Sequence, residues 1–235
     1  MDQISRIRKI SIWIFVLPVI VLNVCLFISV NYLIFENTIF AVDQIGRSGF
    51  TIPYIDGGVS ISRTARTYPT YLIFKPGMII TAFLLIKYWI ANNKLVQIIN
   101  DQNEKNYRFL FFGFSSAIFL IAHSIFLGVS FEYDLYKFFR RFILLCFIIF
   151  EIVAQALLVI TLFKIKDKIS NFINKKVLIL KIVLVSLLSI VALASLPILT
   201  STGHTSFKHA LEWNYFIGIV AFYLLTFLFW KKRQA

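Results

Sequence analysis

The chain has 235 residues, of which 59% are hydrophobic, 17% aromatic and only 15% charged. Because soluble globular domains carry about 25% charged residues, this composition excludes a soluble domain. Apolar runs of about twenty residues recur along the whole chain, which is typical of a helical membrane protein with several spans. A transmembrane β-barrel would show short alternating segments instead. We therefore predict an all-α polytopic membrane protein with a single membrane domain, residues 1–235.

The formal net charge of +13 does not indicate a nucleic-acid-binding protein. Most Lys and Arg residues lie in short segments beside apolar runs, where they set topology and meet anionic headgroups. Outside these runs the sequence has no basic patch with interleaved stacking aromatics, so we predict no nucleic-acid partner. Cys25 and Cys146 fall inside apolar runs and are expected to pack as small apolar side chains.

Six apolar runs predict a bundle of six transmembrane helices. They cover about residues 10–35, 71–90, 109–130, 142–163, 177–199 and 209–230. An even number of spans places both termini on one side, and 16 of the 24 Lys and Arg residues lie on that side, six of them in residues 164–181. Because cytoplasmic segments carry the excess of Lys and Arg, we predict cytosolic termini in a plasma, inner or endomembrane.

The loop between the first two spans, residues 36–70, is expected to be external and to face water. Apolar side chains in residues 36–46 favour a short interfacial helix. The glycines and the proline that follow, up to Gly58, exclude a long continuous helix. The end of the loop and the start of the second span read SISRTARTYPTYLIFKPG, a stretch rich in hydroxyl and basic side chains.

Polar residues inside the predicted spans are few, and Glu151 is the strongest candidate among them. Counted from Arg141 at 1.5 Å per residue, Glu151 lies about 15 Å into the membrane. An unpaired carboxylate there is costly and must face the bundle, become neutral or find a partner. Gln155 follows one helical turn later, and His123 lies at a similar depth, so we predict a contact between His123 and Glu151. The contact is either a polar clasp between two helices or a functional pair.

A second group of polar residues opens the sixth span. His209, Glu212 and Trp213 have i, i+3, i+4 spacing and share one helix face at the predicted external interface. They either anchor the helix at the interface or form a headgroup or partner site with arginines of the long loop, since arginine suits bidentate contact with phosphate. The candidate lipid- or partner-binding residues are Ser60, Ser62, Arg63, Arg66, His209, Glu212 and Trp213.

A metal site is the less favoured interpretation of the histidines. Catalytic zinc takes three ligands from His and carboxylate side chains. His204 and His209, however, straddle a predicted loop–helix junction, and His123 lies deeper than both. We therefore predict no metal ligands and no cofactor. The sequence also lacks a Gly-rich phosphate loop and a Gly-x-Ser-x-Gly nucleophile motif.

The loop stretch SISRTARTYPTYLIFKPGM and the opening of the sixth span, HALEWNYF, resemble the Frag/DRAM/Sfk-type family of six-span membrane proteins. This family includes damage-regulated autophagy modulators, the FGF-receptor-activating protein type and GPI-lipid-remodelling proteins. The positions that carry the resemblance are Ser60, Ser62, Pro69, Phe74, Gly77, His209, Glu212 and Trp213. The resemblance covers nearly the whole chain and implies a role around lipids, as a remodelling factor, sensor or scaffold.

The leading functional expectation is recognition on the external face, without chemistry of its own. Its partners would be membrane lipids through their headgroups, or alternatively another membrane protein or a lipid-anchored protein. The alternative is an intramembrane lipid-modifying enzyme, a hydrolase or acyltransferase, that uses His123, Glu151, His209 and Glu212. The two differ in whether these side chains would act on a bound lipid or only hold the protein together.

Overall fold

The computed structural model describes residues 2–41, 50–101, 107–129, 134–200 and 203–231. Its elements are α1 (Asp2–Val30), the 3-10 helix η1 (Tyr32–Phe35), α2 (Pro53–Asp56), α3 (Ile61–Arg66), α4 (Tyr71–Asn100), α5 (Arg108–Phe126), α6 (Asp134–Lys164), the 3-10 helix η2 (Ser170–Phe172), α7 (Lys175–Thr200) and α8 (Thr205–Phe229). Six of the described helices, α1 and α4 to α8, are long and apolar enough to cross a membrane. The predicted all-α class with six spans is confirmed.

The six long helices pack against one another in a closed ring. Along this ring α1 packs on α4, α4 on α5, α5 on α6, α6 on α7 and α7 on α8, and α8 returns to α1. Contact across the ring between α6 and α8 is sparse. The ring therefore has an interior that can hold both a polar cluster and a cavity.

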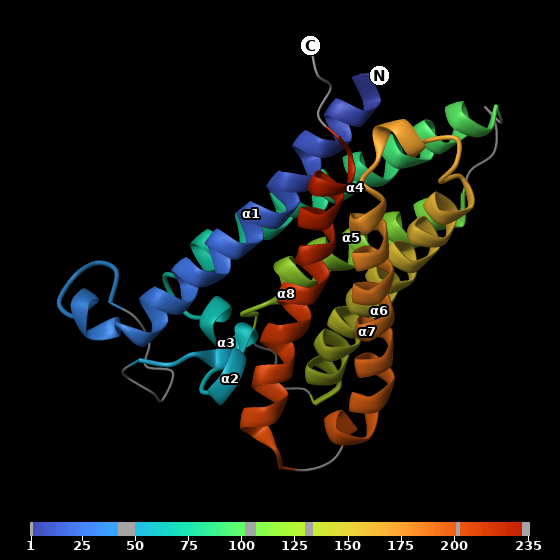
Figure 1. The fold of residues 1–235 in the computed structure, drawn as a ribbon. Helices are drawn as coiled ribbons and strands as arrows, with labels where there is room; N and C mark the ends of the chain where they lie inside the picture. The colour runs from blue at the N-terminus through green and yellow to red at the C-terminus, as the bar shows by residue number, and fades with distance from the viewer. Residues whose placement is uncertain (1, 42–49, 102–106, 130–133, 201–202, 232–235) are drawn as a thin grey trace.

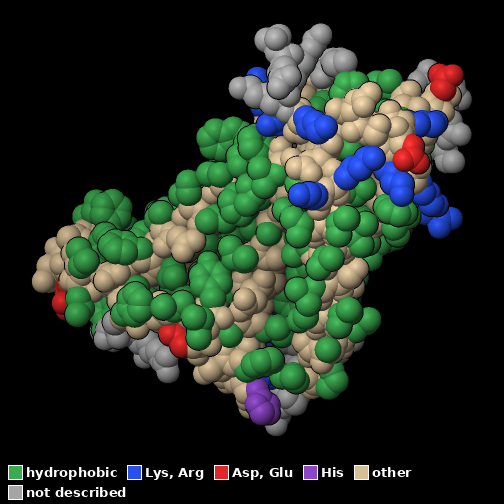
Figure 2. Space-filling model, viewed as in Figure 1, with side chains coloured by type: hydrophobic (Ala, Val, Ile, Leu, Met, Phe, Trp, Pro, Cys, Tyr) green, Lys and Arg blue, Asp and Glu red, His purple; other side chains and the backbone are tan. Residues whose placement is uncertain are grey.

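The two ends of the bundle differ in what they carry. Both termini lie at one end, together with the connections from α4 to α5 and from α6 to α7 (Figure 1). We call this the terminal end, and the opposite end, which carries α2 and α3, the loop end. Figure 2 shows Lys and Arg side chains gathered near the terminal end, while hydrophobic side chains cover the flanks. Hydrophobic flanks of this kind are what a lipid environment requires.

Helix α4 is longer than the predicted span, which ended at residue 90. It continues to Asn100 and stops at Asp101, which has a left-handed backbone conformation with φ of 54°. The asparagines that follow residue 90, Asn92 and Asn93, find hydrogen-bond partners close by. Asn92 donates a hydrogen bond to the carbonyl oxygen of Tyr88, and Asn93 accepts one from the backbone N–H of Tyr107. With these groups satisfied, the helix continues past the predicted membrane boundary.

Two other boundaries also differ from the sequence prediction. Helix α6 begins at Asp134, eight residues before the predicted span, so its first two turns extend the span at the loop end. Helix α1 begins at Asp2 and ends at Val30. The interfacial helix expected in residues 36–46 is not found in residues 36–41, which form turns, and its remainder lies outside the described residues.

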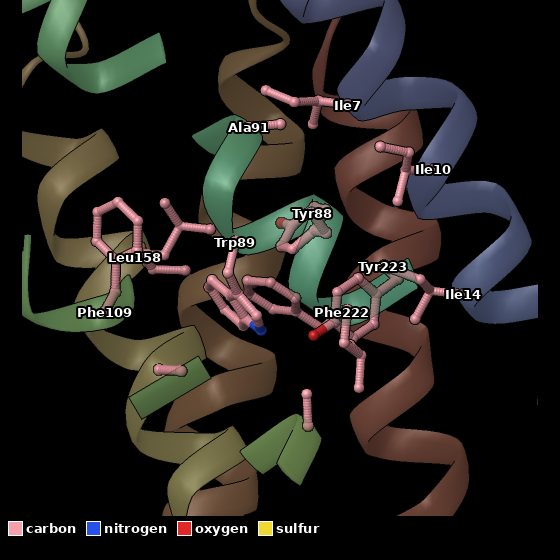
Figure 3. Packing of buried hydrophobic residues seen from close by; sticks show 14 of the residues in the cluster. Ile7, Ile10, Ile14, Tyr88, Trp89, Ala91, Phe109, Leu158, Phe222 and Tyr223 are labelled. Atoms are coloured by element: carbon pink, nitrogen blue, oxygen red, sulfur yellow. The ribbon is translucent and has the colours of Figure 1, made fainter. Parts of the chain in front are cut away.

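The bundle core is built around aromatic residues of α4. Tyr88 and Trp89 are fully buried, and their rings meet edge to face with centroids 5.0 Å apart. Figure 3 shows them between the side chains of α8 and those of α5. A Cβ atom at Gly113 would overlap the indole of Trp89. Helices α4 and α5 can therefore approach closely only because residue 113 has no side chain, as is common for helix pairs in membranes.

Candidate functional site

The first turns of α8 bind the backbone of the loop that carries α2 and α3. His209 Nδ1 lies 3.1 Å from the carbonyl oxygen of Gly57. One turn later, Trp213 Nε1 donates a 2.9 Å hydrogen bond to the carbonyl oxygen of Val59. Trp213 is fully buried, so its N–H needs such an acceptor. These two side chains fix the loop segment between α2 and α3 on α8.

Two more residues of α8 bind the loop on either side of this segment, one at α2 and one at α3. Asn214 Nδ2 donates a 2.8 Å hydrogen bond to the carbonyl oxygen of Tyr54 in α2. The carboxylate of Glu212 accepts hydrogen bonds from the backbone N–H groups of Ile61 and Ser62. These N–H groups open α3 and have no partner inside the helix, so Glu212 completes the start of α3. We call His209, Glu212, Trp213 and Asn214 the loop clamp.

The serines and arginines of the predicted site lie on α3. The Ser60 side chain caps the helix by accepting a 3.2 Å hydrogen bond from the backbone N–H of Arg63, and its Oγ lies 3.2 Å from Ser62 Oγ. Arg63 and Arg66 are exposed at the loop end. The structure thus brings the serines together with the clamp, and leaves the arginine side chains facing outward.

A third arginine, Arg140 of α6, lies close to these two. Burial lowers the pKa of Arg66 below its usual value, and the positive charges of Arg140 and Arg63 lower it further. Two positive charges therefore act on Arg66, one from Arg63 on the same helix and one from Arg140 of α6. The Nε atom of Arg140 is buried without a hydrogen-bond partner among the described residues. The guanidinium of Arg140 also lies over the ring of Tyr136, with its Cζ atom 5.4 Å from the ring centroid. Sequence analysis assigned Arg140 only to topology.

A cavity occupies the interior of the ring toward the loop end. It has about 780 Å³ of empty space, including the part that is open to the outside. Side chains of α1, α4, α5, α6 and α8 line it, and Ile61 of α3 lies over it. Most of the lining is aliphatic or aromatic. Its polar members are Thr81, His123, Glu151, Glu212, Tyr215 and Tyr223. Two carboxylates and a histidine thus face one largely apolar space.

Glu151 is fully buried and accepts hydrogen bonds from three helices. Ser116 of α5 donates to its Oε2 at 2.6 Å, and Gln155 of α6 donates to its Oε1 at 3.0 Å. The hydroxyl of Tyr223 in α8 donates to the same Oε1. Gln155 also donates to the carbonyl oxygen of Ile219, 3.2 Å away. The acid predicted to face the bundle therefore joins α5, α6 and α8.

The predicted partner of Glu151 is not the one observed. No hydrogen bond among the described residues joins His123 to Glu151. The residue of α5 that donates a hydrogen bond to Glu151 is Ser116. Ser116 lies seven residues before His123, which is about 10 Å along a helix. The two helices run antiparallel, and α6 begins earlier than predicted, so Glu151 is set deeper than His123. His123 instead lines the cavity nearer the loop end and interacts electrostatically with Arg140.

Sequence analysis did not predict that Lys181 is buried inside the bundle. It was counted among the lysines that set topology, yet it is fully buried in α7. Its Nζ donates a 2.7 Å hydrogen bond to Thr226 Oγ1 and lies 4.0 Å from the ring centroid of Phe222. The available signal was its place four residues inside the predicted fifth span, where a charge is expected to face protein.

The described residues contain no group of three or more His, Cys, Asp and Glu side chains arranged to hold a metal ion. His204 is exposed at the start of α8, and His209 binds the loop backbone. Comparisons with protein-family models, with curated proteins and with solved structures found no match to this chain. Functional inference therefore depends on the cavity, the arginines and the loop clamp.

Proposed function

We propose that this multi-pass membrane protein binds an anionic phospholipid from the leaflet at its loop end. The hydrocarbon chain of the lipid enters the cavity, and its phosphate contacts Arg63, Arg66 and Arg140. The observation that carries the proposal is the proximity of Arg140 and Arg63 to Arg66 at the end of the bundle toward which a largely apolar cavity extends. Arginine forms charge-assisted, often bidentate hydrogen bonds with phosphate.

The geometry around Arg140 supports this arrangement. Arg140 acts electrostatically on Arg66 on one side and on the cavity-lining His123 on the other. A headgroup held by the arginines would therefore lie at the edge of the cavity. Its apolar lining suits a hydrocarbon chain better than a water-soluble ligand.

The loop clamp has a supporting role in the proposal. By fixing Gly57, Val59 and the start of α3 on α8, it also fixes the helix that carries Arg63 and Arg66 and that lines the cavity through Ile61. His209, Glu212 and Trp213 are then positioning residues and not lipid ligands. The sequence resemblance to the Frag/DRAM/Sfk-type family implies a role around lipids, which supports the same proposal, and cytosolic termini would place the bound lipid in the external leaflet.

The test uses the full chain purified in detergent and titrated with phosphatidylglycerol or phosphatidylcholine, with lipid adducts counted by native mass spectrometry. We expect wild type to prefer the anionic lipid, and Arg66→Gln combined with Arg140→Gln to remove that preference. Arg108→Gln is the matched control, because Arg108 is exposed at the terminal end. Equal binding of the two lipids by wild type, or an unchanged preference in the double variant, would refute the proposal.

A lipid-modifying enzyme is the second candidate, and one observation favours it. His123 and Glu212 line the same cavity that would hold the lipid, so acid–base groups would lie near the bound molecule. Glu212 already accepts two backbone hydrogen bonds, which argues for a structural role. Lipid analysis after incubation of the protein with the bound phospholipid separates the two functions, since only an enzyme would produce a cleaved or transferred acyl chain.

A further inference from the structure

A buried amine and a buried acid lie at the two ends of one polar chain inside the bundle. Lys181 Nζ donates to Thr226 Oγ1, and the hydroxyl of Tyr88 lies 3.2 Å from the same oxygen. The ring of Tyr88 meets that of Tyr223 edge to face, with centroids 4.9 Å apart. Tyr223 in turn donates to Glu151. Three hydroxyl side chains therefore lie between the amine and the acid, with a hydrogen bond at every step except the one between Tyr88 and Tyr223.

The two ends of this chain approach opposite ends of the protein. Lys181 lies six residues after Lys175, where α7 begins, and thus about 9 Å from the terminal end. Glu151 lines the cavity, which extends toward the loop end. Burying a charged residue inside a membrane span is costly, so such residues are rare. Those that occur commonly mark ion or proton pathways. The chain therefore runs along the direction that a proton would follow in crossing the membrane.

The hydrogen bonds around Glu151 suit both of its protonation states. Ser116 Oγ lies 2.9 Å from the carbonyl oxygen of Gly113 and 2.6 Å from Glu151 Oε2, yet a hydroxyl donates only one hydrogen. When Ser116 donates to Glu151, the acid is a carboxylate with three donors. When Ser116 donates to Gly113, its oxygen can accept a hydrogen from protonated Glu151. The site can therefore gain or lose a proton without losing its partners.

We propose that this chain conducts protons between the cavity and the terminal end, with Glu151 as the proton-binding group. A proton from cavity water binds Glu151, each hydroxyl passes on its own hydrogen as it receives another, and the amine of Lys181 releases one at the terminal end. Only O–H and N–H bonds form and break, so no oxidant or reductant is needed. The proposal is independent of the lipid.

The gate of this path is the contact between Tyr88 and Tyr223. No hydrogen bond among the described residues joins the two phenols, although their rings touch. Figure 3 shows both rings in the core between α4 and α8. Closing this gap requires one tyrosine to swing about its Cα–Cβ bond, because rotation of a phenol ring about its own axis leaves the hydroxyl oxygen in place. The other residues with an acid or imidazole side chain that line the same cavity are His123 and Glu212.

The decisive experiment measures proton entry into vesicles. The full chain is reconstituted with a trapped pH-sensitive dye, and valinomycin with a potassium gradient supplies the driving potential. We expect wild type to acidify the vesicles faster than protein-free vesicles, and Glu151→Gln, Tyr223→Phe and Lys181→Met to remove the difference. Tyr215→Phe is the matched control for Tyr223, because Tyr215 lines the same cavity but bonds Ser195.

Each result of this experiment decides the proposal. Wild-type vesicles no faster than protein-free ones would overturn it, as would a full rate in Glu151→Gln or Tyr223→Phe. Equal loss of rate in the Tyr215→Phe control would also overturn it, since the effect would then reflect general damage to the cavity. Size-exclusion profiles of the variants that match wild type establish that a lost rate is not a folding defect.

A chemical test on the wild-type chain avoids variants altogether. Dicyclohexylcarbodiimide is apolar enough to enter the cavity, and it reacts with a protonated carboxyl group. The acid O–H adds across a C=N bond to give an O-acylisourea, which rearranges to a stable N-acylurea. We expect the label on Glu151, less labelling at higher pH, and a proton rate that falls as labelling rises. An unlabelled Glu151 at every pH, or a full rate after complete labelling, would overturn the proposal.

Discussion

Gly57 packs directly against the backbone of Ser206. A Cβ atom on residue 57 would overlap the carbonyl group of Ser206, which cannot move without breaking the first turn of α8. Gly57 also has a φ of 58°, a left-handed conformation that side chains with a Cβ disfavour. Two independent constraints therefore require glycine at the point where the loop meets the clamp.

We expect Gly57→Ala to release the loop from α8 while the six long helices remain folded. The overlap with Ser206 cannot be relieved locally, so the hydrogen bond from His209 to residue 57 should be lost first. Limited proteolysis from the loop end should then cut residues 50–66 more rapidly than in wild type. Gly203→Ala is the matched control, because Gly203 also has a positive φ, of 86°, but a Cβ there would meet no atom within 4 Å. Equal protease resistance of the two variants would contradict the role of the contact.

Trp213→Phe tests a single hydrogen bond of the loop clamp. The substitution keeps an aromatic ring in the buried site but removes the donor to the Val59 carbonyl. A buried carbonyl left unpaired costs about 1–3 kcal/mol. We expect a lower thermal unfolding temperature and a more protease-sensitive loop, measured in detergent by scanning fluorimetry and digestion. Phe216→Leu, one turn further along α8, is the control; a loop as sensitive in that variant would show that packing, and not the hydrogen bond, matters.

The sequence predicted that the long loop and the opening of α8 lie at one end, because both flank spans on the same side. It could not predict how they bind. His209 and Trp213 contact carbonyl oxygens, and every residue carries one, so no residue type marks the acceptors. The sequence pattern suggested a surface for a ligand, whereas the structure uses most of these side chains to hold the loop.

The error over Glu151 has a different physical cause. The rise of an α-helix is fixed, but the residue at which a helix enters the membrane is not. Counting from Arg141 placed Glu151 level with His123, while the earlier start of α6 places it level with Ser116. Lys181 was missed because its burial depends on how α7 is rotated, and neighbours such as Leu180 are exposed. Rotation is set by packing partners that a single sequence does not reveal.

Topology gives a further prediction. The C-terminus should be cytosolic and the loop end external, because Lys and Arg gather at the terminal end (Figure 2). In a chain with both native cysteines replaced, Ile55→Cys should react with an impermeant maleimide added to intact cells, since Ile55 is 78% exposed at the loop end. Lys168→Cys, exposed in the connection from α6 to α7, should react only after permeabilisation. The reverse pattern would invert the orientation.

The last prediction separates the hydrogen bonds of Glu151 from its charge. In Glu151→Gln the amide oxygen can still accept from Tyr223, and the amide nitrogen can donate to Ser116, which then donates to Gly113. We expect a stability close to that of wild type, because the substitution also removes the cost of burying a charge. In Glu151→Leu the Tyr223 hydroxyl loses its acceptor, whereas Gln155 keeps the Ile219 carbonyl.

The expected loss for Glu151→Leu is therefore about 1–3 kcal/mol, the cost of one orphaned buried donor. Equilibrium unfolding in mixed micelles measures it, with Ile149→Leu, an exposed position on the same helix, as the control for a change of apolar side chain. A double variant with Tyr223→Phe should recover most of the loss, because it removes the orphaned hydroxyl. If Glu151→Gln is as unstable as Glu151→Leu, the carboxylate charge itself holds the bundle together, and the hydrogen bonds alone do not.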